Sequence, residues 1–282
     1  MAGEEERAER PHSAPARHVR ALPGNGDTER RGACEQGVTV REFGVFDSDI
    51  VLTADVHLEG EGGRSDVFIE LLRRYAALPV VVIGDLFSYW YERWGKVPPR
   101  FAGVIDRISS LERKAPVFLV PGNRDLLVGG ILEKRSRGAL RVAPEVVRLE
   151  ERGVVITHGD MLTRYDSHYR MYRFVLSSGL MSMLARMVPE AAAEWVAFRL
   201  KRMSAAEKRR RGEKLMPLEL AEAAKLFSGE ARSLICGHFH PDFLVSYVGA
   251  GRSVRVLPAW ESAPGSHAVL TPEGAFSYNA GL

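Results

Sequence analysis

The chain has 282 residues, a formal net charge of +3, 45% hydrophobic residues and 27% charged residues. These proportions are ordinary for a globular protein, and so small a net charge does not by itself indicate nucleic-acid binding. No apolar stretch approaches the roughly 18 residues of a membrane-spanning helix, and Glu4 to Glu6 stand where a signal peptide would be apolar. A disulfide between the two cysteines, Cys34 and Cys236, is not expected, so we predict a cytoplasmic protein.

The composition divides the chain into an extension and a domain. Residues 1–38 are rich in Glu, Arg, Pro, Gly and Ala and contain almost no aromatic side chains. Such a segment buries too little apolar surface to offset the entropy of ordering, so we predict that it is disordered. Residues 39–282 are predicted to form one α/β domain, interrupted by a helical insertion over about 166–228.

Apolar and β-branched runs predict the strands of this domain in chain order. In the first half they predict strands over 49–56, 80–83, 116–120 and 154–157. Amphipathic segments between them predict one helix with Ser65 as its N-cap and another over 101–111. After the insertion, strands are expected over 233–236, 244–248, 253–257, 267–270 and 276–278. Strands that alternate with helices in this way indicate a largely parallel sheet with covered faces.

Oxygen and imidazole side chains stand in five short segments, most of them directly after a predicted strand. They are Asp55, His57, Asp85, Asn123, His158, His238 and His240. Such groups bind divalent transition metals, and strand ends are where α/β folds place their chemistry. Asp55 and His57 are two residues apart and would point the same way in a strand. Taken singly, each residue could be a turn former or a structural histidine, but together they predict a two-metal phosphoesterase site.

The order Asp-x-His, Gly-Asp, Gly-Asn-x-Asp, His-Gly-Asp and Gly-His-x-His resembles the calcineurin-like metallophosphoesterases over about residues 48–278. The resemblance implies a β-sandwich flanked by helices. It also implies two divalent metal ions, usually Mn²⁺, with iron or zinc as alternatives. By the same resemblance, one ion is held by Asp55, His57, Asp85 and His240, and the other by Asp85, Asn123, His158 and His238.

The segment Gly122-Asn-Arg-Asp carries Arg124 where many members of this superfamily carry histidine. A guanidinium cannot act as a general acid at neutral pH, but it can bind phosphate oxygens bidentately. Arg124 therefore indicates a leaving group that is itself a phosphate, as in the cleavage of a diphosphate bond. Pairing of Arg124 with its neighbour Asp125 is the alternative.

Three segments further resemble the UDP-2,3-diacylglucosamine diphosphatases of lipid A synthesis: Gly122 to Gly129, His158 to Leu162 followed by Asp166, and Ala259-Trp260. That resemblance implies hydrolysis to UMP and a lipid monophosphate. It assigns catalysis to Asp85, Asn123 and Arg124, and substrate contacts to Asn123, Arg124, Asp166 and His238. The Met-rich stretch from Met171 to Met187 suits an acyl-binding cap, and ordinary helix packing would explain it as well.

The run from Lys201 to Lys214 contains seven basic and two acidic residues. It suits peripheral contact with an anionic membrane, and a solvated helix face is the alternative. No aromatic residues interleave with the run, so a nucleic-acid partner is disfavoured. Ser88 stands where relatives often have an acid, and Gly-His-Phe-His-Pro lacks a usual arginine. These departures leave a metallophosphoesterase acting on another phosphodiester or a phosphoprotein as an alternative. A metal-binding scaffold without activity is a separate alternative, which the seven intact ligand positions disfavour.

Overall fold

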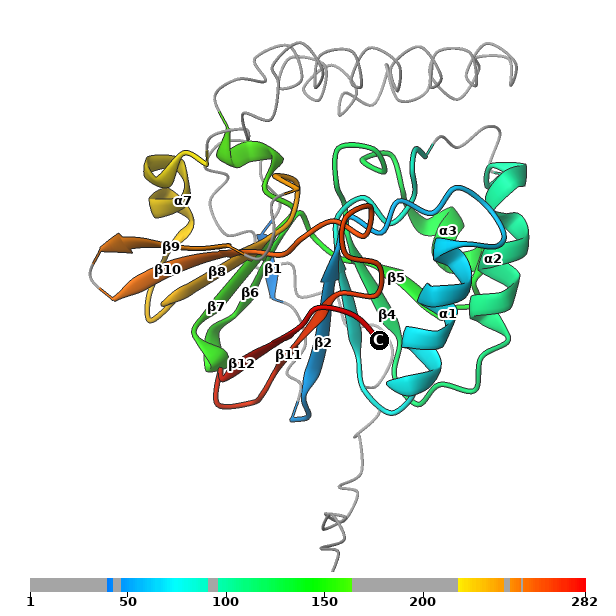
Figure 1. The fold of residues 1–282 in the computed structure, drawn as a ribbon, viewed down its shortest axis with the longest axis horizontal. Coiled ribbons are helices and arrows are strands. Elements are labelled where there is room, and N and C mark those ends of the chain that lie inside the picture. Colours follow the sequence, from blue (N-terminus) through cyan, green and yellow to red (C-terminus); the bar gives the residue numbers. More distant parts are fainter. Residues whose placement is uncertain (1–39, 43–46, 91–95, 164–217, 241–243, 250) are drawn as a thin grey trace, which may run out of the picture. The chain divides into compact units, whose positions relative to one another are not determined.

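Two six-stranded sheets form the centre of the fold in this computed structural model (Figure 1). The structure describes residues 40–42, 47–90, 96–163, 218–240, 244–249 and 251–282. In spatial order, the first sheet comprises β12 (Phe276–Asn279), β11 (His267–Leu270), β2 (Ile50–Ala54), β3 (Val80–Ile83), β4 (Val117–Val120) and β5 (Leu140–Val142). The second sheet comprises β1 (Val40–Glu42), β6 (Val146–Leu149), β7 (Val154–Thr157), β8 (Ser233–Cys236), β10 (Arg252–Val256) and β9 (Leu244–Gly249).

Parallel pairing dominates the centre of both sheets. Strands β2, β3, β4 and β5 pair in parallel, and β11 and β12 extend this sheet in antiparallel fashion. Strands β7, β8 and β10 also pair in parallel, with β6 and β9 antiparallel beside them. The prediction of parallel strands is confirmed for these central segments, but they belong to two mixed sheets and not to one. Within each sheet, the carboxyl ends of the parallel strands share one edge.

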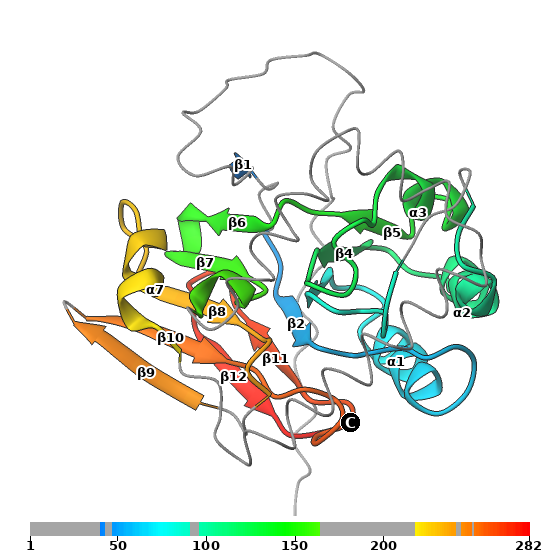
Figure 2. The same ribbon diagram turned by 90° about the horizontal axis from the view of Figure 1, so that it is seen from above.

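Alternate residues of each strand face different apolar layers. Ile50 and Leu52 of β2 pack between the sheets with Ile156 and Ile235 of the second sheet. Val51 faces the opposite way, into a core formed with helices of the first sheet's outer face. These helices are α1 (Arg64–Arg74), α2 (Pro99–Ser109) and α3 (Gly130–Arg135), seen from above in Figure 2. Helix α7 (Leu220–Leu226) covers the outer face of the second sheet, so the predicted sandwich flanked by helices is confirmed.

The start of α1 differs from the sequence prediction. The helix begins at Arg64, and Gly63 is its N-cap with φ of 52°. Ser65 lies inside the first turn, where its hydroxyl donates to the carbonyl of Gly60. Ser65 as N-cap is therefore wrong, because a glycine can adopt the left-handed backbone that the preceding turn requires. The predicted apolar face is confirmed, since Phe68, Leu71 and Leu72 are fully buried.

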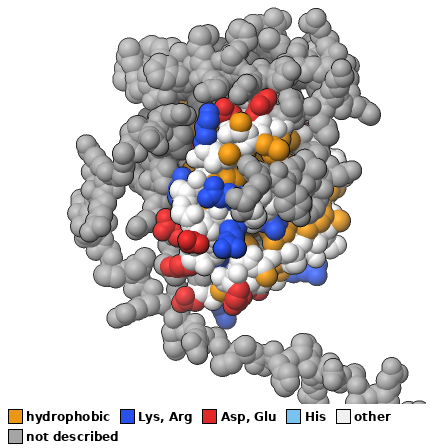
Figure 3. All heavy atoms as spheres, turned by 90° about the vertical axis from the view of Figure 1, so that its left-hand side faces the viewer, with side chains coloured by type: hydrophobic (Ala, Val, Ile, Leu, Met, Phe, Trp, Pro, Cys, Tyr) orange, Lys and Arg blue, Asp and Glu red, His pale blue; other side chains and the backbone are white. Residues whose placement is uncertain are grey.

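Several predictions fall outside the described residues. The predicted extension 1–38 is among them, and so are Asp166, the Met-rich stretch and the basic run from Lys201 to Lys214. At the end of the predicted insertion, the described part contains α7. Among the residues described, no helix is long and apolar enough to cross a membrane. On the face that Figure 3 shows, both acidic and basic side chains appear among apolar ones.

Candidate metal centre

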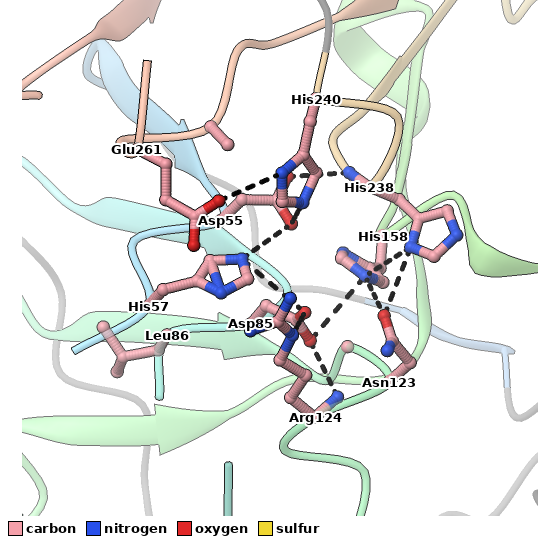
Figure 4. Close-up of polar contacts among 12 residues, drawn as sticks. Asp55, His57, Asp85, Leu86, Asn123, Arg124, His158, His238, His240 and Glu261 are labelled. Carbon is pink, nitrogen blue, oxygen red and sulfur yellow. Dashed lines mark hydrogen bonds and ion pairs between the residues drawn. The ribbon is translucent and has the colours of Figure 1, made fainter. Parts of the chain in front are cut away.

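The structure brings all seven predicted ligand residues together at the carboxyl ends of five strands, as Figure 4 shows. Asp55 and His57 follow β2, Asp85 follows β3, and Asn123 follows β4. From the second sheet, His158 follows β7, and His238 and His240 follow β8. The parallel pairing within each sheet places these strand ends at one edge, so residues up to 185 positions apart (240 − 55) meet in space.

Five of the seven residues adopt a left-handed backbone. The φ angles are 48° for Asp55, 52° for His57, 51° for Asp85, 69° for His238 and 53° for His240. Among the described residues, Arg137 is the one other non-glycine residue with positive φ. Each such residue costs about 1 kcal/mol or more, and this kind of strain clusters at functional sites. Asp55 and His57 therefore converge through tight turns after β2 ends at Ala54, and not through strand alternation as predicted.

One group of side chains surrounds the Oδ1 atom of Asp55. The Nε2 atom of His57 lies 3.5 Å from Asp55 Oδ1 and 3.8 Å from Asp85 Oδ2. The Nε2 atom of His240 lies 3.6 Å from the same Asp55 Oδ1. One ligand atom from each of Asp55, His57 and His240 lies within 4.8 Å of the other two, a spacing that a single cation can bridge.

A second group surrounds the side-chain oxygen of Asn123. This oxygen lies 3.0 Å from His158 Nε2 and 3.2 Å from His238 Nδ1, and the two ring nitrogens are themselves 3.2 Å apart. Asp85 Oδ1 lies 3.7 Å from His158 Nε2. Since Oδ2 of Asp85 faces His57, the two oxygens of this carboxylate face different groups. Asp85 is thus placed to bridge two cations.

Buried polar atoms without partners test whether metal ions fit here. In the part of the chain that is described, Asp55 Oδ1, both ring nitrogens of His57 and His238 Nε2 are buried and make no hydrogen bond. Buried polar groups are nearly always satisfied, and a buried carboxylate oxygen without a hydrogen-bond partner is costly. Divalent cations at the two groups would supply partners for Asp55 Oδ1 and His57 Nε2. The mixed oxygen and imidazole ligands fit manganese, iron and zinc, and do not distinguish among them.

Burial keeps two of these histidines in the form that binds metals. It lowers the pKa of both His57 and His238 to about 3, so each ring is neutral and offers a lone pair. Burial also raises the pKa of Asp85, against the opposing effects of His158 and Arg124. A cation between these groups would favour the ionised carboxylate, and metal binding is therefore expected to release protons.

Glycines allow the strand ends to approach one another closely. A Cβ atom on Gly122 would overlap the carboxylate and backbone nitrogen of Asp85. A Cβ atom on Gly237 would overlap the carboxylate of Asp55 and lie 2.8 Å from the Cβ of Ala54. The glycine in each of these motifs is thus required by the packing of the carboxylates.

Arg124 pairs with Asp85 and not with its neighbour Asp125. Its Nε lies 3.3 Å from Asp85 Oδ2, and its backbone N–H donates to Asp85 Oδ1 at 2.8 Å. The buried carboxylate of Asp125 instead accepts from the backbone amides of Gly122 at 2.6 Å and Leu86 at 2.8 Å. Asp125 therefore fixes the two loops that carry Asn123 and Asp85, and Arg124 belongs to the site itself.

Sequence reasoning missed one residue of the site, Glu261. Its Oε2 lies 3.6 Å from His240 Nδ1 (Figure 4). The preceding pair, Ala259-Trp260, carries the resemblance noted from the sequence, but the glutamate next to it has no recognisable spacing to a ligand motif.

Ser88, where relatives often have an acid, is buried, and its backbone N–H donates to the carbonyl of Leu58 at 2.9 Å.

Comparison with known proteins agrees with this geometry. The UDP-2,3-diacylglucosamine hydrolase of Pseudomonas fluorescens (strain SBW25) is 29% identical over 68% of this chain and 78% of its own length. The proteins of the same name from Shewanella pealeana and Aeromonas hydrophila are each 28% identical, over 74% and 73% of this chain and 89% and 88% of their own lengths. The model of the calcineurin-like phosphoesterase family matches residues 48–242, more than half of the chain, and this range contains all seven residues. The chain therefore belongs to the calcineurin-like phosphoesterase family and is a metal-dependent phosphoesterase.

Proposed function

We propose that this phosphoesterase hydrolyses the diphosphate of UDP-2,3-diacylglucosamine to UMP and a lipid monophosphate. The observation that carries the proposal is the place of Arg124, whose guanidinium lies against Asp85 at the candidate metal centre. The names of the relatives, which span most of this chain, support the same substrate. The coarser conclusion, hydrolysis of a phosphoric ester or diphosphate, follows from the family alone.

In this proposal the seven residues hold two divalent ions, with Mn²⁺ as the expected metal. Asp55, His57, Asp85 and His240 would hold one ion, and Asp85, Asn123, His158 and His238 the other. When bound, the ions would activate water and neutralise the charge of the phosphoryl group. The protein contributes the fixed spacing: Asp85 presents one oxygen to each group, and Asp125 holds the loop of Asn123 in place.

Arg124 would act on the substrate directly. Its guanidinium contacts Asp85 through Nε, and the terminal nitrogens would donate to phosphate oxygens. A guanidinium is not a general acid at neutral pH and cannot protonate a leaving group. A departing phosphate needs no such proton, because it is stable as an anion. An arginine in this position therefore suits a diphosphate better than an alkyl phosphate.

The remaining parts of the proposal rest on the sequence pattern. Asp166 would contact the substrate, and the Met-rich stretch from Met171 to Met187, within the insertion over about 166–228, would take up the acyl chains. The basic run from Lys201 to Lys214 would give peripheral contact with the anionic inner face of a membrane, with the enzyme residing in the cytoplasm.

Hydrolysis by the purified protein tests the substrate. The protein is incubated with Mn²⁺ and UDP-2,3-diacylglucosamine, and in parallel with bis-p-nitrophenyl phosphate. We expect UMP and the lipid monophosphate as products, with both reactions lost on addition of EDTA. Metal-dependent cleavage of the generic diester without any release of UMP would reject the lipid substrate and leave the phosphoesterase assignment intact.

A further inference from the structure

The imidazole of His240 lies between two carboxylates. Its Nε2 is 3.6 Å from Asp55 Oδ1, inside the candidate metal centre. Its Nδ1 is 3.6 Å from Glu261 Oε2, on the outer side. Figure 4 shows Glu261 approaching the ring from the side away from Asn123 and His158. Glu261 is therefore close to a candidate ligand without belonging to either ligand group.

The backbone before Glu261 is anchored to the centre. Trp260 is fully buried and donates from its backbone N–H to the carbonyl of Asp55 at 3.2 Å. Its indole Nε1 donates to Thr53 Oγ1 at 2.8 Å, so both bonds reach the end of the strand that carries Asp55. The residue that follows Trp260 is thus held in a fixed position relative to Asp55.

An arginine lies on the outer side of the Glu261 side chain. Arg64, the first residue of α1, has Nη1 at 4.0 Å from Glu261 Oε1 and Nη2 at 3.7 Å from Glu59 Oε1. The Glu261 side chain is 41% exposed, so this pair adds little to stability. In this arrangement Oε1 of Glu261 faces Arg64 while Oε2 faces His240.

The other candidate histidines have different outer surroundings. His158 Nδ1 lies 3.3 Å from the carbonyl oxygen of Ile83, a neutral acceptor. Among the described residues, His57 Nδ1 and His238 Nε2 are buried without a hydrogen-bond partner. Within that part of the chain, His240 is the one candidate histidine of the four that has a carboxylate beside its outer ring nitrogen.

We propose that Glu261 is a positioning residue that fixes the tautomer and orientation of His240. A negative charge beside Nδ1 favours the tautomer with the proton on that nitrogen, which leaves the lone pair of Nε2 directed at the metal position next to Asp55. Carboxylates that act on a ligating histidine in this way also make the imidazole a stronger donor. The inference rests on the proposed role of His240 as a metal ligand.

Metal titration of the purified, metal-free protein tests this inference without any substrate. Binding of Mn²⁺ is followed by electron paramagnetic resonance for the wild type, Glu261→Ala, Glu261→Gln and the control Glu59→Gln. Glu59 is the matched control because it contacts Arg64 but not His240. We expect Glu261→Ala to weaken the binding of one of the two ions by about 10–100-fold. Glu261→Gln, whose amide oxygen can still accept a hydrogen bond from Nδ1–H, should lose less Mn²⁺ affinity, and Glu59→Gln should match the wild type.

Equal Mn²⁺ affinity in the wild type and Glu261→Ala would overturn the proposal. A loss of Mn²⁺ affinity in Glu59→Gln as large as that in Glu261→Ala would also overturn it, because it would indicate a general effect of charge. The melting temperature of each metal-free variant shows whether it folds. If Glu261→Ala does not fold, Glu261→Gln decides: weaker binding with unchanged melting supports the proposal, and unchanged binding rejects it. Failure to hydrolyse UDP-2,3-diacylglucosamine would leave this result untouched, because the titration contains no substrate.

Discussion

The guanidinium of Arg124 lies 3.3 Å from the carboxylate of Asp85, the residue that faces both candidate metal positions. In this pair, the positive charge that can bind the substrate lies next to the carboxylate that can bridge the two metal ions. The backbone N–H of Arg124 adds a second contact to Asp85, and the backbone N–H of Trp90 donates to the carbonyl of Arg124 at 2.7 Å. The arginine is therefore positioned by both its main chain and its side chain.

Replacing Arg124 should separate substrate binding from metal binding. We expect Arg124→Ala to lower kcat/KM for the diphosphate substrate by about 10²–10³-fold, the loss typical of one preorganised donor in a transition state. Arg124→Lys should recover only part of this loss, because lysine keeps the charge but not the planar fork. Both variants should still bind two Mn²⁺ ions. Activity unchanged in Arg124→Ala would show that the guanidinium does not act on the substrate.

Adding one methyl group at Gly122 should damage the centre, because its Cβ would overlap Asp85. We expect Gly122→Ala to lose Mn²⁺ binding and activity and to be destabilised by about 1–3 kcal/mol, the usual cost of overpacking. Gly130→Ala is the control, since a Cβ there meets no atom within 4 Å. Urea unfolding and Mn²⁺ titration of both variants provide the measurement. A Gly122→Ala protein as active as Gly130→Ala would contradict the packing described here.

Arg113 stabilises the end of α1 through backbone carbonyls. Its guanidinium donates to the carbonyls of Leu72, Tyr75 and Leu78, the last at 2.7 Å. We expect Arg113→Met to lower the free energy of unfolding by about 1.5–3 kcal/mol, because carbonyls that accept from a charged group lose their donor. Arg107→Met, which breaks a surface pair with Asp66, should cost less than about 1 kcal/mol. Similar losses in the two variants would refute this role of Arg113.

Burial of His267 should make stability depend on pH. His267 Nδ1 lies 2.8 Å from the carbonyl of Gly265 and so carries a proton, and Nε2 lies 2.8 Å from the Tyr75 hydroxyl, from which it accepts when the ring is neutral. Burial, with a smaller effect of Arg74, lowers the pKa of His267 below its ordinary value of 6.5. The unfolded chain therefore takes up the proton first, and the contribution of His267 to stability is complete above pH 6.5 and declines as the pH falls below it.

Urea unfolding in the presence of EDTA, at several pH values on both sides of 6.5, measures this effect with the metals removed. His267→Gln should show a shallower decline of unfolding free energy toward acid than the wild type. Tyr75→Phe, which leaves the histidine but removes its partner, is the companion variant and should keep most of the wild-type slope. Parallel curves for the wild type and His267→Gln would rule the histidine out as the source.

Patterns within a few residues predicted much of the fold and of the site. The runs at Val80–Ile83 and Val154–Thr157 are apolar and β-branched throughout, and both strands are where the sequence indicated. The ligand motifs directly follow such runs, so their strand-end positions could be predicted together with the strands. Strands β5 and β6 were not predicted, because Leu140–Val142 and Val146–Leu149 are short and each contains an arginine.

Contacts between residues far apart in the chain could not be predicted from the sequence. Glu261 meets His240 only because Trp260 bonds to the segment carrying Asp55. Arg124 was given Asp125 as its alternative partner because the two are adjacent, whereas Asp85 meets it from another strand. The left-handed turns at Asp55 and His57 were also unforeseen, since non-glycine residues rarely adopt them without tertiary support.

The most direct test of the two-metal centre is the number of Mn²⁺ ions bound by the wild type and by Asp85→Ala, measured together with phosphoesterase activity. Asp106→Ala serves as the control, because Asp106 is an acidic residue that pairs with Arg135 at the surface, away from the site. We predict two tightly bound ions per chain and metal-dependent activity in the wild type and the control. In Asp85→Ala we predict the loss of at least one ion and of activity. Two ions bound with full activity in Asp85→Ala would contradict the bridging role of Asp85 and with it the site described here.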